Sequence, residues 1–145
     1  MNHIAQIAAK LPEYELDAML ITSEPGEYYA LGFHGEGLLL VTRNGAHYST
    51  DSRYIEAAQA QITGTKIALT SREKNHLELA LEFIEANHLE KVGFESSYMS
   101  VDTYHAYADK LPCLMVPAQK LLDDLRAAKD PQELAAMREA QRITD

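Results

Sequence analysis

The chain has 145 residues, a net charge of −9 and a single cysteine. This length suits one domain that can bury a core. The acidic excess and the scattered basic residues argue against a nucleic-acid groove, which needs clustered Lys and Arg. One cysteine, Cys113, excludes an intramolecular disulfide and a thiolate zinc site, and its apolar neighbours favour a buried small side chain. Neither a signal-peptide pattern nor a membrane-length apolar run is present, so we expect a cytoplasmic protein.

The first half of the chain predicts alternating helices and strands. In order, the predicted elements are a helix over 4–11, a strand over 17–23, a turn over 23–27, a constrained loop over 28–37, strands over 37–43 and 46–51, and a helix over 53–61. The first helix has apolar residues at helical spacing and ends at Pro12. The two later strands are joined by Asn44-Gly45, which is the strongest short hairpin signal.

The second half continues this alternation. The predicted elements are strands over 66–70, 91–97 and 113–118, and helices over 73–88 and 101–110. The helix over 73–88 is strongly amphipathic, with Leu77, Ala80, Leu81 and Ile84 on one face. Alternating helices and strands indicate a layered α/β domain, and the hairpin makes its sheet mixed.

The C-terminal segment predicts a further helix. Asp130 and Glu133 are spaced as a capping box, and Pro131 suits the first helical position. That helix reaches the last residue without a C-cap glycine, so we expect the natural protein to continue beyond Asp145.

No metal, nucleotide or nucleophile site is predicted. The six histidines (3, 34, 47, 76, 88 and 105) fall on separate predicted elements without an HExxH pattern. The sequence GFHGEG precedes a strand, whereas a dinucleotide-binding loop follows one and opens a helix. A GxSxG elbow is also absent. We therefore assign no catalytic residue and no metal ligand.

The corner YSTDSRYIEAAQA (48–60) joins a strand to a helix. Asp51 is a candidate N-cap whose carboxylate offsets the charge of Arg53, a residue poorly placed at a helix N-terminus. Tyr54 can pack its ring and keep its hydroxyl in water. A structural joint is a better interpretation of this corner than direct chemistry.

The predicted loop is aromatic and glycine-rich, with Tyr28, Tyr29, Phe33, His34 and Glu36. Aromatic residues beside glycines on an exposed loop are typical of a contact surface. The same residues also allow a loop that folds onto its own core through Phe33. The residues alone leave both interpretations open.

The order of DAMLITS, YYALGF, LLLVTRNGAHYSTDSRYIEAA and LLDDLRAAKDPQELAAMREAQRITD resembles the creatinase/prolidase N-terminal domain over essentially the whole chain. The more specific parts are the corner of Thr50, Asp51, Arg53 and Tyr54 and the segment 129–140. The family often has N-x-x-YLTGF around the aromatic loop.

This chain departs from that pattern. It has Gly26, Ala30 and Leu31 at the Asn, Leu and Thr positions. The Trp that often lies near the loop is missing, because the chain has no Trp.

The resemblance implies a ribonuclease H-like, three-layer α/β fold over residues 1–128. It also implies that 129–145 form a linker helix to a C-terminal pita-bread catalytic domain beyond this sequence. In Xaa-Pro dipeptidases and aminopeptidases that domain holds two divalent metals, manganese, cobalt or zinc, through two Asp, one His and two Glu. None of these ligands maps onto this chain, which is expected to be inactive alone.

By the same resemblance, the N-terminal domain forms a homodimer and lends a rim to the partner's active site, which takes short proline-containing peptides. The rim candidates are Tyr29, Phe33, His34 and Glu36. The corner of Asp51, Arg53 and Tyr54 is expected to hold loop and hairpin in register. Two alternatives remain: a stand-alone dimerisation or regulatory domain of the same fold, and a small-molecule-binding α/β domain.

Overall fold

The computed structural model describes residues 2–128, so the predicted linker helix over 129–145 lies outside the described residues. Its centre is a six-stranded sheet with the order β4-β3-β2-β1-β5-β6. The strands are β1 (Ala18–Ile21), β2 (Gly37–Thr42), β3 (Gly45–Thr50), β4 (Thr65–Leu69), β5 (Lys91–Phe94) and β6 (Leu114–Pro117). Only β2 runs antiparallel to its neighbours. The carboxyl ends of the other five strands therefore lie at one edge of the sheet.

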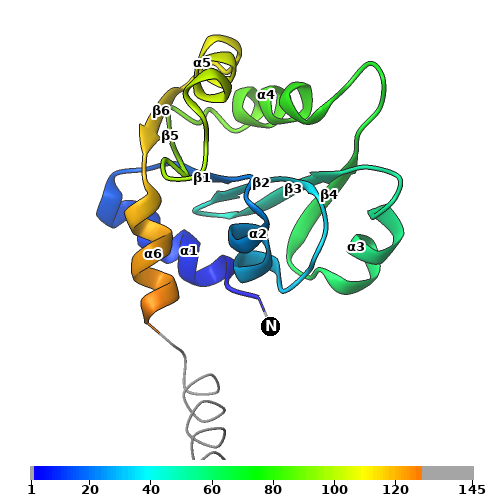
Figure 1. Cartoon of the computed structure of the whole chain (residues 1–145), viewed down its shortest axis with the longest axis horizontal. Coiled ribbons are helices and arrows are strands. Elements are labelled where there is room, and N and C mark those ends of the chain that lie inside the picture. The colour runs from blue at the N-terminus through cyan, green and yellow to red at the C-terminus, as the bar shows by residue number, and fades with distance from the viewer. Residues whose placement is uncertain (1, 129–145) are drawn as a thin grey trace, which may run out of the picture.

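Helices cover both faces of this sheet (Figure 1). They are α1 (Ile4–Lys10), α2 (Glu24–Leu31), α3 (Ile55–Gln61), α4 (His76–Ala86), α5 (Val101–Lys110) and α6 (Gln119–Ala127), with a short 3-10 helix, η1 (Leu11–Tyr14), after α1. Helices α4 and α5 lie on one face, and the other helices lie on the opposite face. The predicted layered α/β domain with a mixed sheet is confirmed. Helix α6 is not among the predicted elements.

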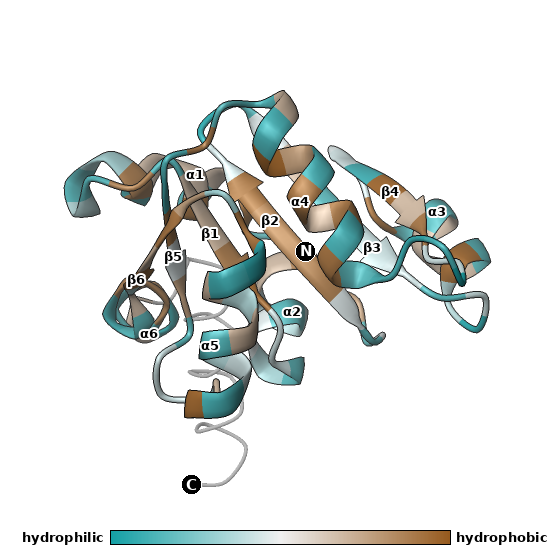
Figure 2. Cartoon of the chain, turned by 90° about the horizontal axis from the view of Figure 1, so that it is seen from above, coloured by the Kyte–Doolittle hydropathy of each residue, from teal (hydrophilic) through white to brown (hydrophobic). Residues whose placement is uncertain are grey.

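Two apolar clusters fill the spaces between the layers. Tyr48 of β3, which is fully buried, belongs to the cluster beneath α1, α2, α3 and α6. Leu38 and Leu40 of β2 belong to the cluster beneath α4 and α5. The strong apolar character of β2 is visible where it crosses the sheet beneath α4 (Figure 2). Successive side chains along a strand thus point alternately into the two apolar clusters, as expected for a sheet covered on both sides.

Side-chain caps and one turn define the element ends. Ser23, Asn75 and Ser100 are the N-caps of α2, α4 and α5, and each side-chain oxygen accepts a backbone N–H from the first turn. The predicted hairpin is confirmed, with Gly45, the first residue of β3, at a φ of 154°. That conformation favours glycine, which explains the Asn-Gly pair.

The segment 23–31 corrects two predictions. Most of the expected turn over 23–27 and the first four residues of the expected loop over 28–37 form helix α2. Ser23 caps this helix, Pro25 lies in its first turn, and Gly32 ends it at a φ of 67°. Proline is well tolerated in the first turn of a helix, so Pro25 and Gly26 do not mark a turn here.

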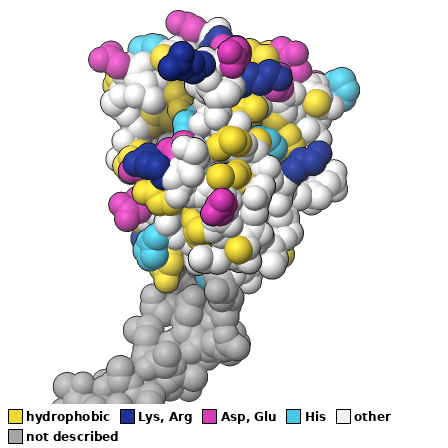
Figure 3. All heavy atoms as spheres, turned by 90° about the vertical axis from the view of Figure 1, so that its right-hand side faces the viewer, with side chains coloured by type: hydrophobic (Ala, Val, Ile, Leu, Met, Phe, Trp, Pro, Cys, Tyr) yellow, Lys and Arg dark blue, Asp and Glu magenta, His cyan; other side chains and the backbone are white. Residues whose placement is uncertain are grey.

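The surface over the β4 edge mixes hydrophobic, acidic, basic and histidine side chains, with no field of one sign (Figure 3). This face offers no basic stripe for a nucleic acid. Within residues 2–128, none of the helices combines the length and apolar character that a bilayer crossing requires.

Candidate functional site

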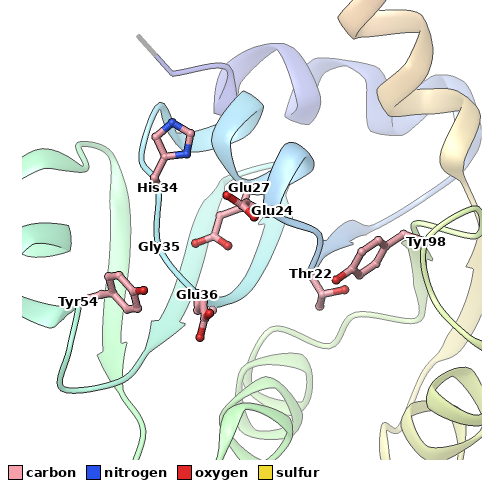
Figure 4. Close-up of a pocket in the computed structure, with 9 residues that line it drawn as sticks. Thr22, Glu24, Glu27, His34, Gly35, Glu36, Tyr54 and Tyr98 are labelled. Carbon is pink, nitrogen blue, oxygen red and sulfur yellow. The ribbon is translucent and has the colours of Figure 1, made fainter.

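A hollow of about 400 Å³ lies at the carboxyl edge of the sheet. Its walls come from the end of β1, the start of α2, the segment 34–37, and two loops that follow β3 and β5. Three glutamates and two tyrosines provide most of its chemistry: Glu24, Glu27, Glu36, Tyr54 and Tyr98. Figure 4 shows Tyr54 and Tyr98 on opposite sides of the hollow, with the glutamates between them.

The exposed lip of the hollow contains an ion-paired arginine. Arg53 donates from Nη2 to Glu36 at 2.6 Å and to Asp51 at 2.7 Å. Its guanidinium also lies 5.1 Å from the centre of the Tyr54 ring. The hydrogen bond from Arg53 lowers the pKa of Asp51. Arg53 and Glu36 are largely exposed, so solvent screens their attraction.

The buried side of the hollow depends on a tyrosine–glutamate pair. Glu27 of α2 is 2% exposed and accepts a hydrogen bond from the hydroxyl of Tyr48 on β3. Burial raises the pKa of Glu27, and the bond from Tyr48 opposes part of that rise. Burial, followed by the bond to Glu27, raises the pKa of Tyr48. This pair attaches α2 to the centre of the sheet.

A second buried carboxylate attaches the start of α2 to β5. Glu95 is 2% exposed and accepts the backbone N–H groups of Thr22, at 2.7 Å, and Ser23, at 2.9 Å. The Ser23 hydroxyl also donates to Glu95 and accepts the N–H of Gly26 at 3.0 Å. A Cβ on Gly26 would lie 2.5 Å from Oε2 of Glu95. The close packing explains why glycine suits this position in this chain.

Sequence reasoning missed Glu27, Tyr48 and Glu95. One usable signal was present for Glu95, because it directly follows a buried strand at the sheet edge where such strands end. For Glu27 and Tyr48 the helical assignment of 23–31 was required first. Only that assignment places Glu27 on the buried face of α2.

The rim candidates separate into two groups. His34 and Glu36 are exposed and line the hollow, and His34 stacks on Tyr28 with ring centres 3.9 Å apart. Phe33 is only 5% exposed and packs in the core, as in the alternative that the sequence left open. Tyr29 is half-buried and stacks on His3 at 4.1 Å.

The corner after β3 contacts the segment that lines the hollow. The Thr50 hydroxyl donates to the Glu36 carbonyl at 2.8 Å, and Arg53 reaches the Glu36 carboxylate. The prediction that Asp51 is the N-cap of the helix is wrong, because α3 begins later and Tyr54 is its N-cap. Asp51 instead accepts the backbone N–H of Arg53 at 2.9 Å, which closes a short turn before the helix.

The described residues offer little for metal or thiol chemistry. Within residues 2–128, no three His, Cys, Asp or Glu side chains come together in a way that could hold a metal ion. Cys113 is half-buried, and burial raises its pKa, which keeps the thiol protonated.

Comparison with protein families gives a match over residues 3–128 to the creatinase/prolidase N-terminal domain. The chain belongs to this family. A curated relative, the uncharacterized peptidase YqhT of Bacillus subtilis (strain 168), is 30% identical over 132 residues, which is 90% of this chain and 37% of the relative.

Solved structures of this creatinase/prolidase domain agree with the fold. The Xaa-Pro dipeptidase from Bacillus anthracis superposes with a TM-score of 0.84 at 25% identity, over 94% of this chain and 38% of that one. The aminopeptidase P from Streptococcus thermophilus gives 0.75 at 29% identity, over 83% of this chain and 93% of that one. The chain therefore spans less than two fifths of the Bacillus subtilis and Bacillus anthracis relatives.

Proposed function

We propose that this creatinase/prolidase domain is the non-catalytic N-terminal domain of an Xaa-Pro peptidase, and that its hollow contacts the substrate. The observation that carries the proposal is the hollow itself. Carboxylates and tyrosine rings line it, and buried hydrogen bonds of Glu27 and Glu95 hold its walls in place. The names of the Bacillus anthracis and Streptococcus thermophilus relatives supply the substrate class.

The chemistry of the hollow suits a cation. Carboxylates attract an ammonium group, and tyrosine faces bind cations through their ring quadrupole. A short peptide with a free N-terminus carries such an ammonium group. Arg53 already occupies this kind of position, over Tyr54 and beside Glu36, which supports the assignment. On this proposal, the hollow binds the N-terminal ammonium group of the peptide substrate.

In this division of labour, two divalent metals of a separate catalytic domain would activate water and stabilise the oxyanion. The residues described here would bind and orient the peptide and restrict its length. Dimerisation through this domain would place the hollow beside the partner's active site, as the family resemblance implies.

The test is steady-state kinetics of a protein that carries this domain together with a catalytic domain. We expect Glu24→Gln to raise KM for an Xaa-Pro dipeptide by about two- to fivefold, the effect of an exposed charge pair, and to leave kcat unchanged. The matched control is Glu56→Gln, an exposed glutamate of α3 that does not line the hollow. An unchanged KM in Glu24→Gln would contradict substrate contact, and a fall in kcat alone would place Glu24 in the chemical step.

A second candidate is a stand-alone dimerisation or regulatory domain of the same fold. The exposed aromatic pair favours it, since Tyr28 is 48% exposed and stacks on His34 beside the hollow. Sedimentation of the 145-residue chain and of Tyr28→Ala tests whether this aromatic pair drives self-association, and the presence or absence of a catalytic domain in the natural protein separates the two roles. Self-association of this chain that Tyr28→Ala abolishes, together with a natural protein that has no catalytic domain, would favour this second role.

A further inference from the structure

The contact between β3 and α4 differs from the rest of the core. On β3, Ala46 and Tyr48 face the larger apolar cluster, whereas His47 and Ser49 face α4. The neighbouring strand β2 places the aliphatic side chains of Leu38 and Leu40 beneath α4. The contact of α4 with the sheet therefore has two halves. The half over β2 is apolar, and the half over β3 is polar and titratable (Figure 2).

His47 lies in a site built for a neutral ring. It is 8% exposed, and its ring stacks on Phe83 of α4 with ring centres 4.7 Å apart. Its Nδ1 atom is buried and has no hydrogen-bond partner among the described residues. Its partner in the β3–β4 ladder is Lys66, whose charge repels a proton on His47. A proton on Nδ1 would therefore be a buried donor without an acceptor, beside a like charge.

His76 forms the second half of this contact. It is the first residue of α4, half-buried, and its Nδ1 lies 2.8 Å from the hydroxyl of Ser49 on β3. Asp51 is the acidic group that acts on His76 and favours its protonated form. Of the other charged residues of α4, Glu78 pairs with Lys110 and Glu82 pairs with Lys74, and Glu85 is exposed to solvent.

We propose that the β3–α4 contact is an acid-sensitive latch, which holds α4 on the sheet while both imidazoles are neutral and releases it when they take up protons. The latch needs no ligand and does not rest on the proposed peptidase role. The apolar cluster beneath α1, α2, α3 and α6 lies on the opposite face of the sheet, so the opening leaves that core intact.

The direction of the pH dependence follows from burial. Burial lowers the pKa of His47, and Lys66 lowers it further. Burial also lowers the pKa of His76, against the opposing effect of Asp51. When α4 is released, both imidazoles return toward the ordinary value of about 6.5. Docking of α4 on the sheet is therefore strongest above about pH 6.5. As the pH falls below this value, the equilibrium constant for opening rises, by up to about tenfold per pH unit for each imidazole.

Amide hydrogen exchange of the 145-residue chain at pH 7.5 and 5.5, corrected for intrinsic exchange rates, tests the latch. We expect the opening equilibrium of α4 to rise at the lower pH, by up to about tenfold for each imidazole that takes up a proton, while that of α1 on the opposite face stays unchanged. The variant His47→Leu should lose much of this rise, and the control His105→Leu, at an exposed position of α5, should retain it.

Three outcomes would overturn the proposal. Protection of α4 could be equal at the two pH values. Helices α1 and α4 could open by the same factor, which would mean that acid unfolds the whole domain. His47→Leu could also retain the full pH response of the unmodified chain. The first two outcomes need no variant, so the test stands even if His47→Leu folds poorly.

Discussion

The exposed lip of the hollow (Arg53 and Glu36) and its buried support (Glu27 and Glu95 with their hydrogen-bond partners) both depend on glutamates, but in opposite environments. At the lip, the Arg53 side chain is 61% exposed and its partner Glu36 is 67% exposed. Beneath them, Glu27 and Glu95 are both 2% exposed and are bonded to groups on other elements. Exposed pairs are screened and flexible, whereas buried carboxylates must keep their partners. The support should therefore determine the shape of the hollow, and the lip should determine what it contacts.

Removal of the Glu95 carboxylate should have the largest effect. Glu95→Ala leaves the N–H groups of Thr22 and Ser23 and the Ser23 hydroxyl without their acceptor. We expect a loss of about 3 kcal/mol in the free energy of unfolding, since each unsatisfied buried donor costs about 1–3 kcal/mol. Urea denaturation measures this loss, with the exposed Glu90→Ala as control. A loss no larger than that of the control would show that the buried link does not support α2.

Tyr48→Phe should have the next largest effect. The variant keeps the buried ring and removes the only side-chain donor found for Glu27 within residues 2–128. The expected loss is about 1–2 kcal/mol in the free energy of unfolding, again measured in urea. Tyr98→Phe is the matched control, because Tyr98 is 60% exposed. Equal losses in the two variants would remove the distinction between support and lip.

Glu27→Gln should change how the stability of the domain depends on pH. Because burial raises the pKa of Glu27, the folded chain binds more protons than the unfolded chain above about pH 4.5. Stability from this group is present below that pH and is lost as the pH rises through the raised pKa. The glutamine can still accept from Tyr48 but does not ionise. We therefore expect a smaller fall in Tm between pH 5 and 8, by calorimetry; an unchanged fall would contradict a buried, titrating Glu27.

Arg53→Ala should have the smallest effect on stability. The side chain is exposed, so we expect a fall in Tm below that of either support variant. The readout that sharpens the comparison is KM in a protein with a catalytic domain, which should change because Glu36 and Tyr54 lose their internal cation. A fall in Tm as large as that of Glu95→Ala would place Arg53 among the supports.

Much of the fold could be predicted because its signals are local. The pair Asn44-Gly45 fixes the hairpin, and the apolar stripe with Leu77 and Ile84 fixes α4. The support of the hollow could not be predicted in this way. Glu27 and Tyr48 are 21 residues apart, and Glu95 and Ser23 are 72 residues apart. Glu95 at least follows a buried strand, but nothing local tells Glu27 from the exposed glutamates around it.

The central claim is that this domain supplies shape and contacts and leaves the chemical step to another domain. The most direct measurement is hydrolysis of an Xaa-Pro dipeptide by the purified 145-residue chain in the presence of Mn²⁺. We predict no turnover above that of buffer with Mn²⁺. Hydrolysis at an enzyme-like rate that stays with the chain through purification would contradict the claim.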